Sequence, residues 1–247
     1  MVTESDGGRL SGGLILALDT ATRHPTLALV GADEAVVGER QWQSEHRHGE
    51  QLLQRLDELL AAAGAIPSDL SGVIVAIGPG SFTGLRIGLA TAKTIAYSLA
   101  IPIVGVSTTH ALALAAVGGD IARRDVAVTL PAGAADRYVD RMIVEAEAVL
   151  DPEPAQLVAG GGAFAEAVRD AELIAIDLEA AEDISDEAIE RGQAALAGLA
   201  QALARLGTEA LAAGRSDDVA RLVPAYVALP RGIAKAAAEM KWSPDLR

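Results

Sequence analysis

Cysteine is absent from this sequence, and aromatic residues are scarce. The 247 residues include no Cys, two Trp, two Phe and three Tyr. Without cysteine the chain has no disulfide bond, thiol nucleophile or thiolate metal site, which fits a cytoplasmic protein. Because 51% of the residues are hydrophobic, the chain can still bury a sizeable core. We expect that core to consist mainly of Ala, Leu, Val and Ile.

Long apolar runs and excess positive charge are also missing. No apolar run reaches about 20 residues, so no membrane-spanning helix is expected. The 34 acidic and 20 basic residues give a net charge of −14, which disfavours direct binding of nucleic acid by this chain alone. Residues 1–13 are polar and glycine-rich and lack the basic-then-apolar order of a signal peptide, so they are predicted to form a flexible leader.

Alternating strand and helix patterns predict an α/β fold with two lobes. We expect a first lobe over residues 14–108 and a second, with C-terminal helical and extended segments, over residues 109–247. Apolar runs predict strands at 14–19, 26–30, 35–42, 73–77, 101–106, 126–130, 142–144, 157–159 and 173–176. Helical patterns occur at 50–63, at 107–116, in the segment that begins at Ser81, and at 185–206, with Gly192 and Gly198 as interruptions; residues 222–229 form a late extended segment.

Two turns are candidate anion sites. Asp19 ends the first strand and is followed by hydroxyl side chains, which could hold a metal-bound phosphate or close a hairpin through Asx and Thr turns. The second turn contains two glycines just before a helix N-terminus, so its N–H groups could cradle an anion, although a tight turn with a capped helix explains the same pattern. The candidate residues are Asp19, Thr20, Gly78, Gly80, Ser81 and Thr83.

Small residues recur every four positions in the helix that begins at Ser81. They are Gly84, Gly88, Ala92 and Ala96. Glycine inside a helix costs about 1 kcal/mol relative to alanine, so two glycines on one face indicate that another backbone approaches closely. That backbone belongs either to the chain's own sheet or to a helix of a partner.

The sequence predicts no metal site and no catalytic residue. His46 and His48 flank Arg47, and His24 and His110 have no carboxylate at a motif spacing. Neither an HExxH pattern nor a Cys/His cluster occurs. The GxSxG elbow of serine hydrolases is missing as well.

One long motif resembles a known protein family. It begins at Gly78 and reads GPGSFTGLRIGLATAKTIAYSLAIPIVGVST. This run is similar to the central motif of the TsaB family (also called YeaZ), the bacterial accessory proteins for threonylcarbamoyladenosine synthesis on tRNA. LILALDTAT, HGEQLLQRLDELL, LVAGGGAF and PAYVALPRG agree with the family in the same order. The match is dense over residues 14–112 and thin afterwards.

The resemblance implies two ribonuclease-H-like lobes of the actin/Hsp70/sugar-kinase superfamily. In that superfamily the turn at 19–22 and the glycine turn at 160–162 would flank a nucleotide cleft. The TsaB family is nevertheless regarded as a non-catalytic paralogue of the enzyme TsaD. It forms a heterodimer with TsaD, stabilises it and helps to recruit the ATPase TsaE. The complex transfers threonylcarbamoyl to adenosine 37 of tRNAs that read codons beginning with A.

The resemblance also implies how this chain meets its partners. The first two helices of TsaB proteins pack as a four-helix bundle against the same pair from TsaD or from a second copy, so a homodimer is expected when the chain is alone. Contact with tRNA is expected only through the complex, and no cofactor is expected beyond a weak or interface-dependent nucleotide. The interface residues implied are His48, Leu52, Leu53, Leu56, Leu60, Gly84, Ile87, Gly88 and Thr91.

Two departures from related sequences disfavour catalysis. TsaD carries metal-binding histidines on its first helix, whereas here that helix begins His48-Gly49-Glu50-Gln51-Leu52 and lacks the second one. Many TsaB proteins carry Asp-Ala-Arg on the first strand of the second lobe, where this chain has Pro131, Ala132 and Gly133. One alternative function is an ATP-binding phosphotransferase or ATPase of the same superfamily. A second is a glycoprotease-like peptidase, which the absence of a metal motif, a serine elbow and cysteine disfavours.

Overall fold

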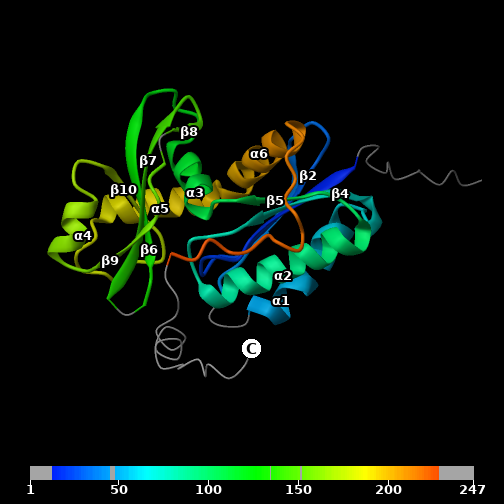
Figure 1. Ribbon diagram of the computed structural model, residues 1–247, viewed down its shortest axis with the longest axis horizontal. Coiled ribbons are helices and arrows are strands. Elements are labelled where there is room, and N and C mark those ends of the chain that lie inside the picture. The colour runs from blue at the N-terminus through cyan, green and yellow to red at the C-terminus, as the bar shows by residue number, and fades with distance from the viewer. Residues whose placement is uncertain (1–12, 45–47, 134, 151, 228–247) are drawn as a thin grey trace, which may run out of the picture.

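The structure consists of two five-stranded sheets with helices packed on both faces (Figure 1). The computed structural model describes residues 13–44, 48–133, 135–150 and 152–227, with only the backbone described at 48–50. The predicted α/β fold with two ribonuclease-H-like lobes is confirmed. The predicted leader at 1–13 lies outside the described residues apart from Gly13. Among the described helices, none has the length and apolar character needed to cross a bilayer.

The first sheet has the strand order β3-β2-β1-β4-β5. Its strands are β1 (Leu14–Asp19), β2 (Thr26–Val30), β3 (Val36–Gln41), β4 (Leu70–Ala76) and β5 (Ile103–Val106). The first three form an antiparallel meander, and β4 and β5 add in parallel. Successive side chains of a strand point to opposite faces, so Leu16 and Leu18 enter one core cluster while Ala17 enters another. Both faces of β1 are therefore buried.

Two helices cover one face of the first sheet. Figure 1 shows α1 (His48–Ala62) and α2 (Phe82–Leu99) together below this sheet. A short 3-10 helix (Pro67–Asp69) leads into β4. The leucine stripe of α1 faces the sheet, and its buried members are Leu52, Leu56, Leu59 and Leu60. The amphipathic pattern of α1 is thus satisfied within the chain itself.

The second sheet contains five strands, with β10, β6, β7 and β8 in order and β9 paired to β7. They are β6 (Arg124–Pro131), β7 (Asp136–Glu145), β8 (Ala148–Leu150), β9 (Gln156–Ala159) and β10 (Glu172–Ala175). The helices of this region are α3 (Thr108–Val117), α4 (Gly162–Ala167) and α5 (Asp186–Ala197). Helix α3 contacts α5, α6 and β6, so it lies between the two sheets.

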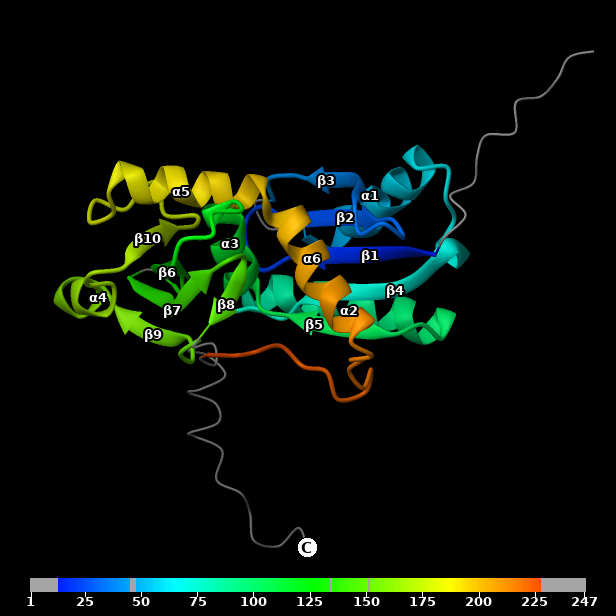
Figure 2. The ribbon, with the colours of Figure 1, turned by 90° about the horizontal axis from the view of Figure 1, so that it is seen from above.

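Helix α6 (Leu199–Ala212) returns to the first sheet after the second sheet is complete. It contacts all five strands of the first sheet, on the face opposite α1 and α2 (Figures 1 and 2). Of the two predicted helix interruptions, Gly198 separates α5 from α6, whereas Gly192 lies inside α5. The first sheet is therefore closed by residues that follow the second sheet in the chain.

Residues 213–227 form an extended segment, here called the strap, which runs along the β5 edge of the first sheet (Figure 2). The Asp217 N–H donates to the Ile103 carbonyl at 2.8 Å, and the Asp217 carboxylate accepts from the Gly105 N–H at 2.7 Å. Lys93 on α2 donates to the Leu222 carbonyl at 3.0 Å. These bonds satisfy backbone groups that an edge strand would otherwise leave open.

The contact of α5 with β10 predicts an inverted response to a helix-favouring substitution. A Cβ atom at Gly192 would lie 1.8 Å from the Ala175 carbonyl oxygen. Gly192→Ala should therefore destabilise the protein by about 1–3 kcal/mol through overpacking, instead of gaining up to about 1 kcal/mol from helix propensity. Urea unfolding measures the change. Gly162→Ala is the control, because nothing lies within 4 Å of that position; a stabilised Gly192→Ala would contradict the packing.

Candidate functional site

Asp19 stands at the end of β1 in the centre of the molecule and is fully buried. Its Oδ1 accepts the Ala21 N–H at 2.6 Å, which forms an Asx turn. Burial raises the pKa of Asp19 to about 6, while the hydrogen bond from the Ala21 N–H acts in the opposite direction and the negative charge of Asp177 adds to the increase. A carboxyl group in this setting is poorly placed to carry a full negative charge.

The hydroxyl groups that follow Asp19 are used inside the protein. Thr20 donates to the Gly84 carbonyl at 2.8 Å, and the Thr22 hydroxyl accepts from the His24 N–H at 3.0 Å. Both threonines are buried. The turn thereby adopts the hairpin-closing arrangement that the sequence allowed as one of its two interpretations.

The glycine turn before α2 packs against the turn after β1. The Ser81 N–H donates to the Ala21 carbonyl at 2.7 Å, and the Ser81 hydroxyl caps α2 by accepting from the Gly84 N–H at 3.2 Å. A Cβ atom at Gly80 would lie 2.4 Å from the Ala21 carbonyl oxygen. Gly78 has a φ of +103° and accepts the Thr108 N–H through its carbonyl at 2.9 Å, and Thr83 is exposed.

The small-residue face of α2 meets the chain's own backbone. A Cβ atom at Gly84 would lie 2.0 Å from the Thr20 carbonyl oxygen, and one at Gly88 would lie 2.1 Å from the Thr20 hydroxyl oxygen. Ala92 and Ala96 are buried in the same core cluster. Of the two close approaches that the sequence allowed, the structure therefore shows the one within the chain.

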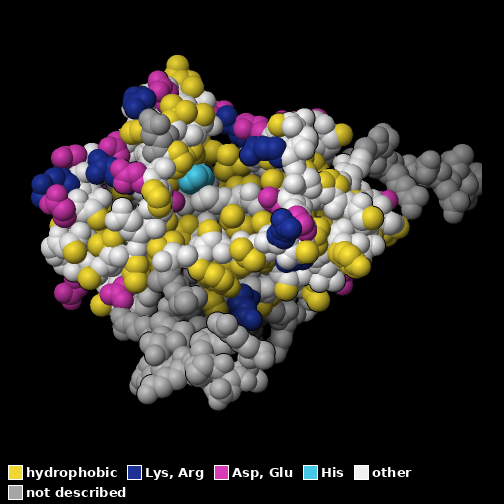
Figure 3. Space-filling model, viewed as in Figure 1, with side chains coloured by type: hydrophobic (Ala, Val, Ile, Leu, Met, Phe, Trp, Pro, Cys, Tyr) yellow, Lys and Arg dark blue, Asp and Glu magenta, His cyan; other side chains and the backbone are white. Residues whose placement is uncertain are grey.

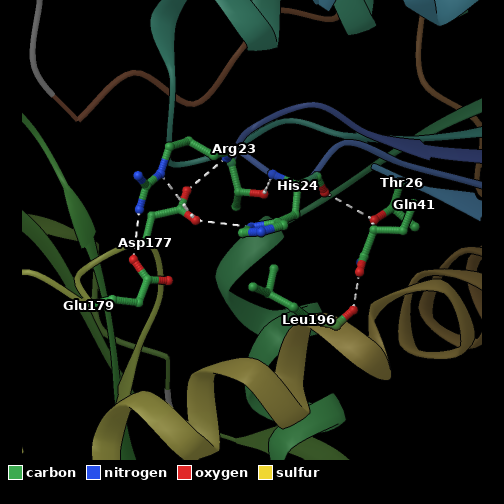
Figure 4. Close-up of polar contacts among 8 residues, drawn as sticks. Arg23, His24, Thr26, Gln41, Asp177, Glu179 and Leu196 are labelled. Atoms are coloured by element: carbon green, nitrogen blue, oxygen red, sulfur yellow. Dashed lines mark hydrogen bonds and ion pairs between the residues drawn. The ribbon is translucent and has the colours of Figure 1, made fainter. Parts of the chain in front are cut away.

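Polar contacts join the turn after β1 to the second lobe, and we call this set the interlobe latch. Asp177, whose side chain is 4% exposed, follows β10 and accepts the Arg23 N–H at 2.7 Å and the His24 ring at 3.1 Å. Arg23 also pairs with Glu179 at 2.8 Å. Figure 4 shows these side chains converging, with Gln41 bonded to the Leu196 carbonyl nearby. The latch brings two carboxylates to the turn where a phosphate would have to bind.

Two cavities lie between the lobes on either side of the β6–β7 turn. The first, called here the interlobe cavity, measures about 260 Å³ and lies among the glycine turn, the β6–β7 turn and the strap. The second measures about 400 Å³ and is rimmed by charged side chains, including Arg23, Asp177 and Glu179. Pro131 and Gly133, in the position of the family's Asp-Ala-Arg motif, line both. Neither cavity is lined by Asp19 or by residues 160–162.

A second polar cluster was not predicted from the sequence. Thr109 on α3 donates to Asp140 on β7 and also bonds Ser107 at 2.9 Å. Burial raises the pKa of Asp140 and lowers the pKa of the neighbouring His110. No local pattern signals this pairing, because the two elements lie about 30 residues apart in sequence. No group of three or more metal-ligating side chains occurs in the part of the chain that the structure describes.

The predicted partner residues fall into two sets. Leu52, Leu56, Leu60, Gly84 and Gly88 are buried in this chain's own core. Leu53 is 56% exposed on α1, and Ile87 and Thr91 are half-buried on α2. The side chain of His48 lies outside the described part. Tyr97 near the end of α2 is 80% exposed, and the aromatic scarcity of the chain could have drawn attention to it.

Residues 42–139 match the family model described as TsaD: tRNA N6-adenosine threonylcarbamoyltransferase. An uncharacterized protein of Mycobacterium tuberculosis (strain ATCC 25618 / H37Rv) is 36% identical over 163 residues, which cover 62% of this chain and 74% of the relative. The tRNA threonylcarbamoyladenosine biosynthesis protein TsaB of Bacillus subtilis (strain 168) is 41% identical over 99 residues. The chain belongs to the TsaB/YeaZ family.

The solved structures agree with the TsaB/YeaZ assignment at the level of the fold. YeaZ from Pseudomonas aeruginosa superposes with a TM-score of 0.63 at 22% identity, covering 87% of this chain and 99% of that one. The sequence match to the Bacillus subtilis TsaB covers only 40% of this chain and 43% of that protein. The family-model match at residues 42–139 includes α1 and α2.

The buried Asp19 carboxyl predicts a pH dependence of stability. Its pKa of about 6 lies above the ordinary 3.8, so the folded state binds this proton more tightly than the unfolded chain. The stability it contributes is complete below about pH 4 and is lost as the pH rises through about 6, a change of roughly 3 kcal/mol. Asparagine does not titrate, so the free energy of unfolding of Asp19→Asn should rise by this amount relative to that of the native protein between those pH values. Urea unfolding measures both. An unchanging difference would contradict the assignment, and Asp57→Asn, an exposed carboxylate on α1, is the control.

The interlobe latch predicts unequal effects of its two carboxylates. Asp177 has a φ of +59°, so glycine is the replacement free of backbone strain. Asp177→Gly leaves the Arg23 N–H without its acceptor, which should cost about 1–3 kcal/mol and speed amide hydrogen exchange in the turn after β1. Glu179→Ala removes only a half-exposed ion pair and should cost less than about 1 kcal/mol. Equal exchange rates in both variants would show that Asp177 does not hold the lobes together.

Proposed function

We propose that this chain is an accessory subunit in threonylcarbamoyladenosine biosynthesis on tRNA and binds a TsaD-like enzyme. Membership of the TsaB/YeaZ family supports this reaction pathway. The observation that carries the partner assignment is the outer surface of α1 and α2, where large apolar side chains stay exposed in a chain with a well-filled core. Exposed apolar groups on paired helices are typical of protein–protein contacts.

The extent of the family match supports a partner related to TsaD. The matched residues 42–139 include α1 and α2 completely. Two chains that share this helix pair can present matching faces to each other, as in the two-fold arrangement of a dimer. A TsaD-like enzyme and a second copy of this chain would then use the same surface. We propose that a homodimer forms when the enzyme is absent.

The contact residues in this proposal are the members of the predicted set that remain exposed or half-buried. Leu53, Ile87 and Thr91 are accessible to a partner, with Tyr97 added from the structure. The buried leucines and glycines act indirectly, because they hold α1 and α2 on the sheet. The proposed surface is therefore narrower than the leucine stripe of the sequence suggests.

We further propose that the chain contributes no chemistry of its own. The groups after Asp19 are bonded within the protein, and Asp177 and Glu179 place negative charge beside the turn, which disfavours a phosphate. Recruitment of a TsaE-like ATPase and contact with tRNA would both occur through the complex. The net charge of −14 supports indirect contact with tRNA, and the cytoplasm is the proposed compartment.

A pair of substitutions on α1 tests the partner surface. Leu53→Asp places a charge on the outer face and should abolish co-elution with the cognate TsaD-like enzyme in size-exclusion chromatography, while the circular dichroism spectrum stays unchanged. Leu56→Asp, 6% exposed, should instead unfold the chain, because it buries an unpaired charge. Leu157→Asp, on an exposed leucine of the second lobe, is the matched control and should bind normally.

Two outcomes would overturn the proposal. A folded Leu53→Asp variant that still co-elutes would remove α1 from the interface. Failure of the unmodified chain to bind the enzyme, with tRNA modification proceeding without it, would remove the accessory role. Calorimetry of the isolated chain with millimolar Mg-ATP distinguishes the accessory role from the alternative function. Heat of binding would favour an ATP-binding enzyme.

A further inference from the structure

The interlobe cavity gathers aromatic side chains in a chain that has few. The sequence holds seven aromatic residues, and three of them, Phe82, Tyr138 and Tyr226, line this cavity. None of the three is fully buried. Aromatic rings that stay partly exposed around a cavity leave apolar surface that a ligand can cover.

One part of the cavity wall belongs to the first lobe and the strap. The rings of Phe82, the first residue of α2, and Tyr226, on the strap, lie 5.1 Å apart with their planes tilted by 34°. The Ala225 N–H holds this part of the strap by donating to the Ile77 carbonyl at 2.8 Å. Figures 1 and 2 show the strap running beside α2 towards the second lobe. Because Tyr226 is 39% exposed, a further ring can pack on this pair.

Another part of the wall comes from the second lobe. Tyr138 on β7 and Leu157 on β9 are directly paired across antiparallel strands, so their side chains lie on the same face of the second sheet. Leu157 is 45% exposed and adds apolar surface to the cavity. Burial raises the pKa of Tyr138, so its hydroxyl stays protonated at neutral pH and can donate or accept a hydrogen bond.

The charge and size of the cavity restrict the class of ligand. The described residues that line it include no Lys, Arg or His, so an anionic ligand would lose hydration without gaining an ion pair. Asp136, which also lines the cavity, already interacts with another residue. The volume of about 260 Å³ lies near the lower limit of small-molecule sites, about 300 Å³. A molecule with one or two rings and few polar groups fits these limits.

We propose that the interlobe cavity binds a small uncharged aromatic molecule that carries a hydroxyl or amide group. The ring of this molecule packs against Phe82 and Tyr226, and its polar group bonds to the Tyr138 hydroxyl. The bound molecule joins the strap and the start of α2 to the second sheet. This site is separate from the partner surface on α1 and α2, so it does not depend on the proposed function.

Titration of the full chain with para-fluorophenol tests the site. This probe is a single uncharged ring with one hydroxyl, and its fluorine NMR signal should shift saturably as millimolar probe binds. The anion para-fluorobenzoate has the same ring and should bind about ten-fold more weakly, because no basic side chain of the wall pairs with it. Lack of saturable para-fluorophenol binding would overturn the proposal, as would equal binding of the two probes.

Matched substitutions locate the bound probe. Tyr226→Ala removes one ring of the wall and should weaken para-fluorophenol binding several-fold, whereas Tyr97→Ala, on the 80% exposed tyrosine of α2, should leave it unchanged. Leu157→Arg puts a charge in the wall and should also weaken binding several-fold, while Leu150→Arg, 37% exposed on β8, is its control. Circular dichroism checks that each variant is folded. Equal affinities within either pair would place the probe elsewhere and overturn the proposal.

The Tyr138 hydroxyl has a test of its own that does not disturb the apolar wall. Tyr138→Phe keeps the ring and should weaken the binding of para-fluorophenol several-fold, because the hydrogen bond to the probe is lost. Fluorobenzene has no hydroxyl, so its affinity should stay the same in this variant. A loss of affinity that is equal for both probes would contradict the role of the hydroxyl.

Discussion

The fold depends on the close contact between α2 and the turn that follows β1. Gly84 and Gly88 bring the helix backbone onto Thr20 so tightly that no Cβ atom fits at either position. This contact lets Ser81 bond to the turn through its N–H while its hydroxyl caps the helix. Because α2 then lies on the sheet at a fixed height, its opposite side is held rigidly towards solvent. A surface presented this way is pre-organised for a partner.

The same turn is bonded on its other side to the second lobe. Asp177 accepts from Arg23 and His24, so the place where a nucleotide-binding relative would hold a phosphate is occupied by contacts within the protein. The glycine turn at 160–162 is exposed and lies between β9 and α4 in the second lobe. Figure 3 shows charges of both signs at the outer end of that lobe, and a surface of mixed apolar, neutral and charged side chains over α2 and the strap. The contacts of Asp177 are consistent with the accessory role proposed above, in which the chain binds another protein.

The sequence predicts the first lobe almost element by element, because its apolar runs are flanked by clear glycine and proline breaks. It cannot decide which side of a wide apolar stripe is buried, so Leu53 and Leu56 look equivalent until the sheet is in place. The small-residue face of α2 has the same ambiguity. A pair of glycines indicates that another backbone approaches closely, but not whether that backbone belongs to this chain or to a partner. The pairing of Thr109 with Asp140 and the return of α6 depend on tertiary contacts that leave no local pattern.

The return of α6 makes the second lobe an insertion within the first. The face of the first sheet opposite α1 and α2 is covered only when residues up to Ala212 are available. During synthesis, the strands of the first lobe can pair early, but one of their apolar faces stays exposed until residues 199–212 have left the ribosome. Contacts over so long a sequence separation slow folding and expose intermediates to association. The first lobe therefore acquires its complete core only after the segment that forms the second sheet has been made.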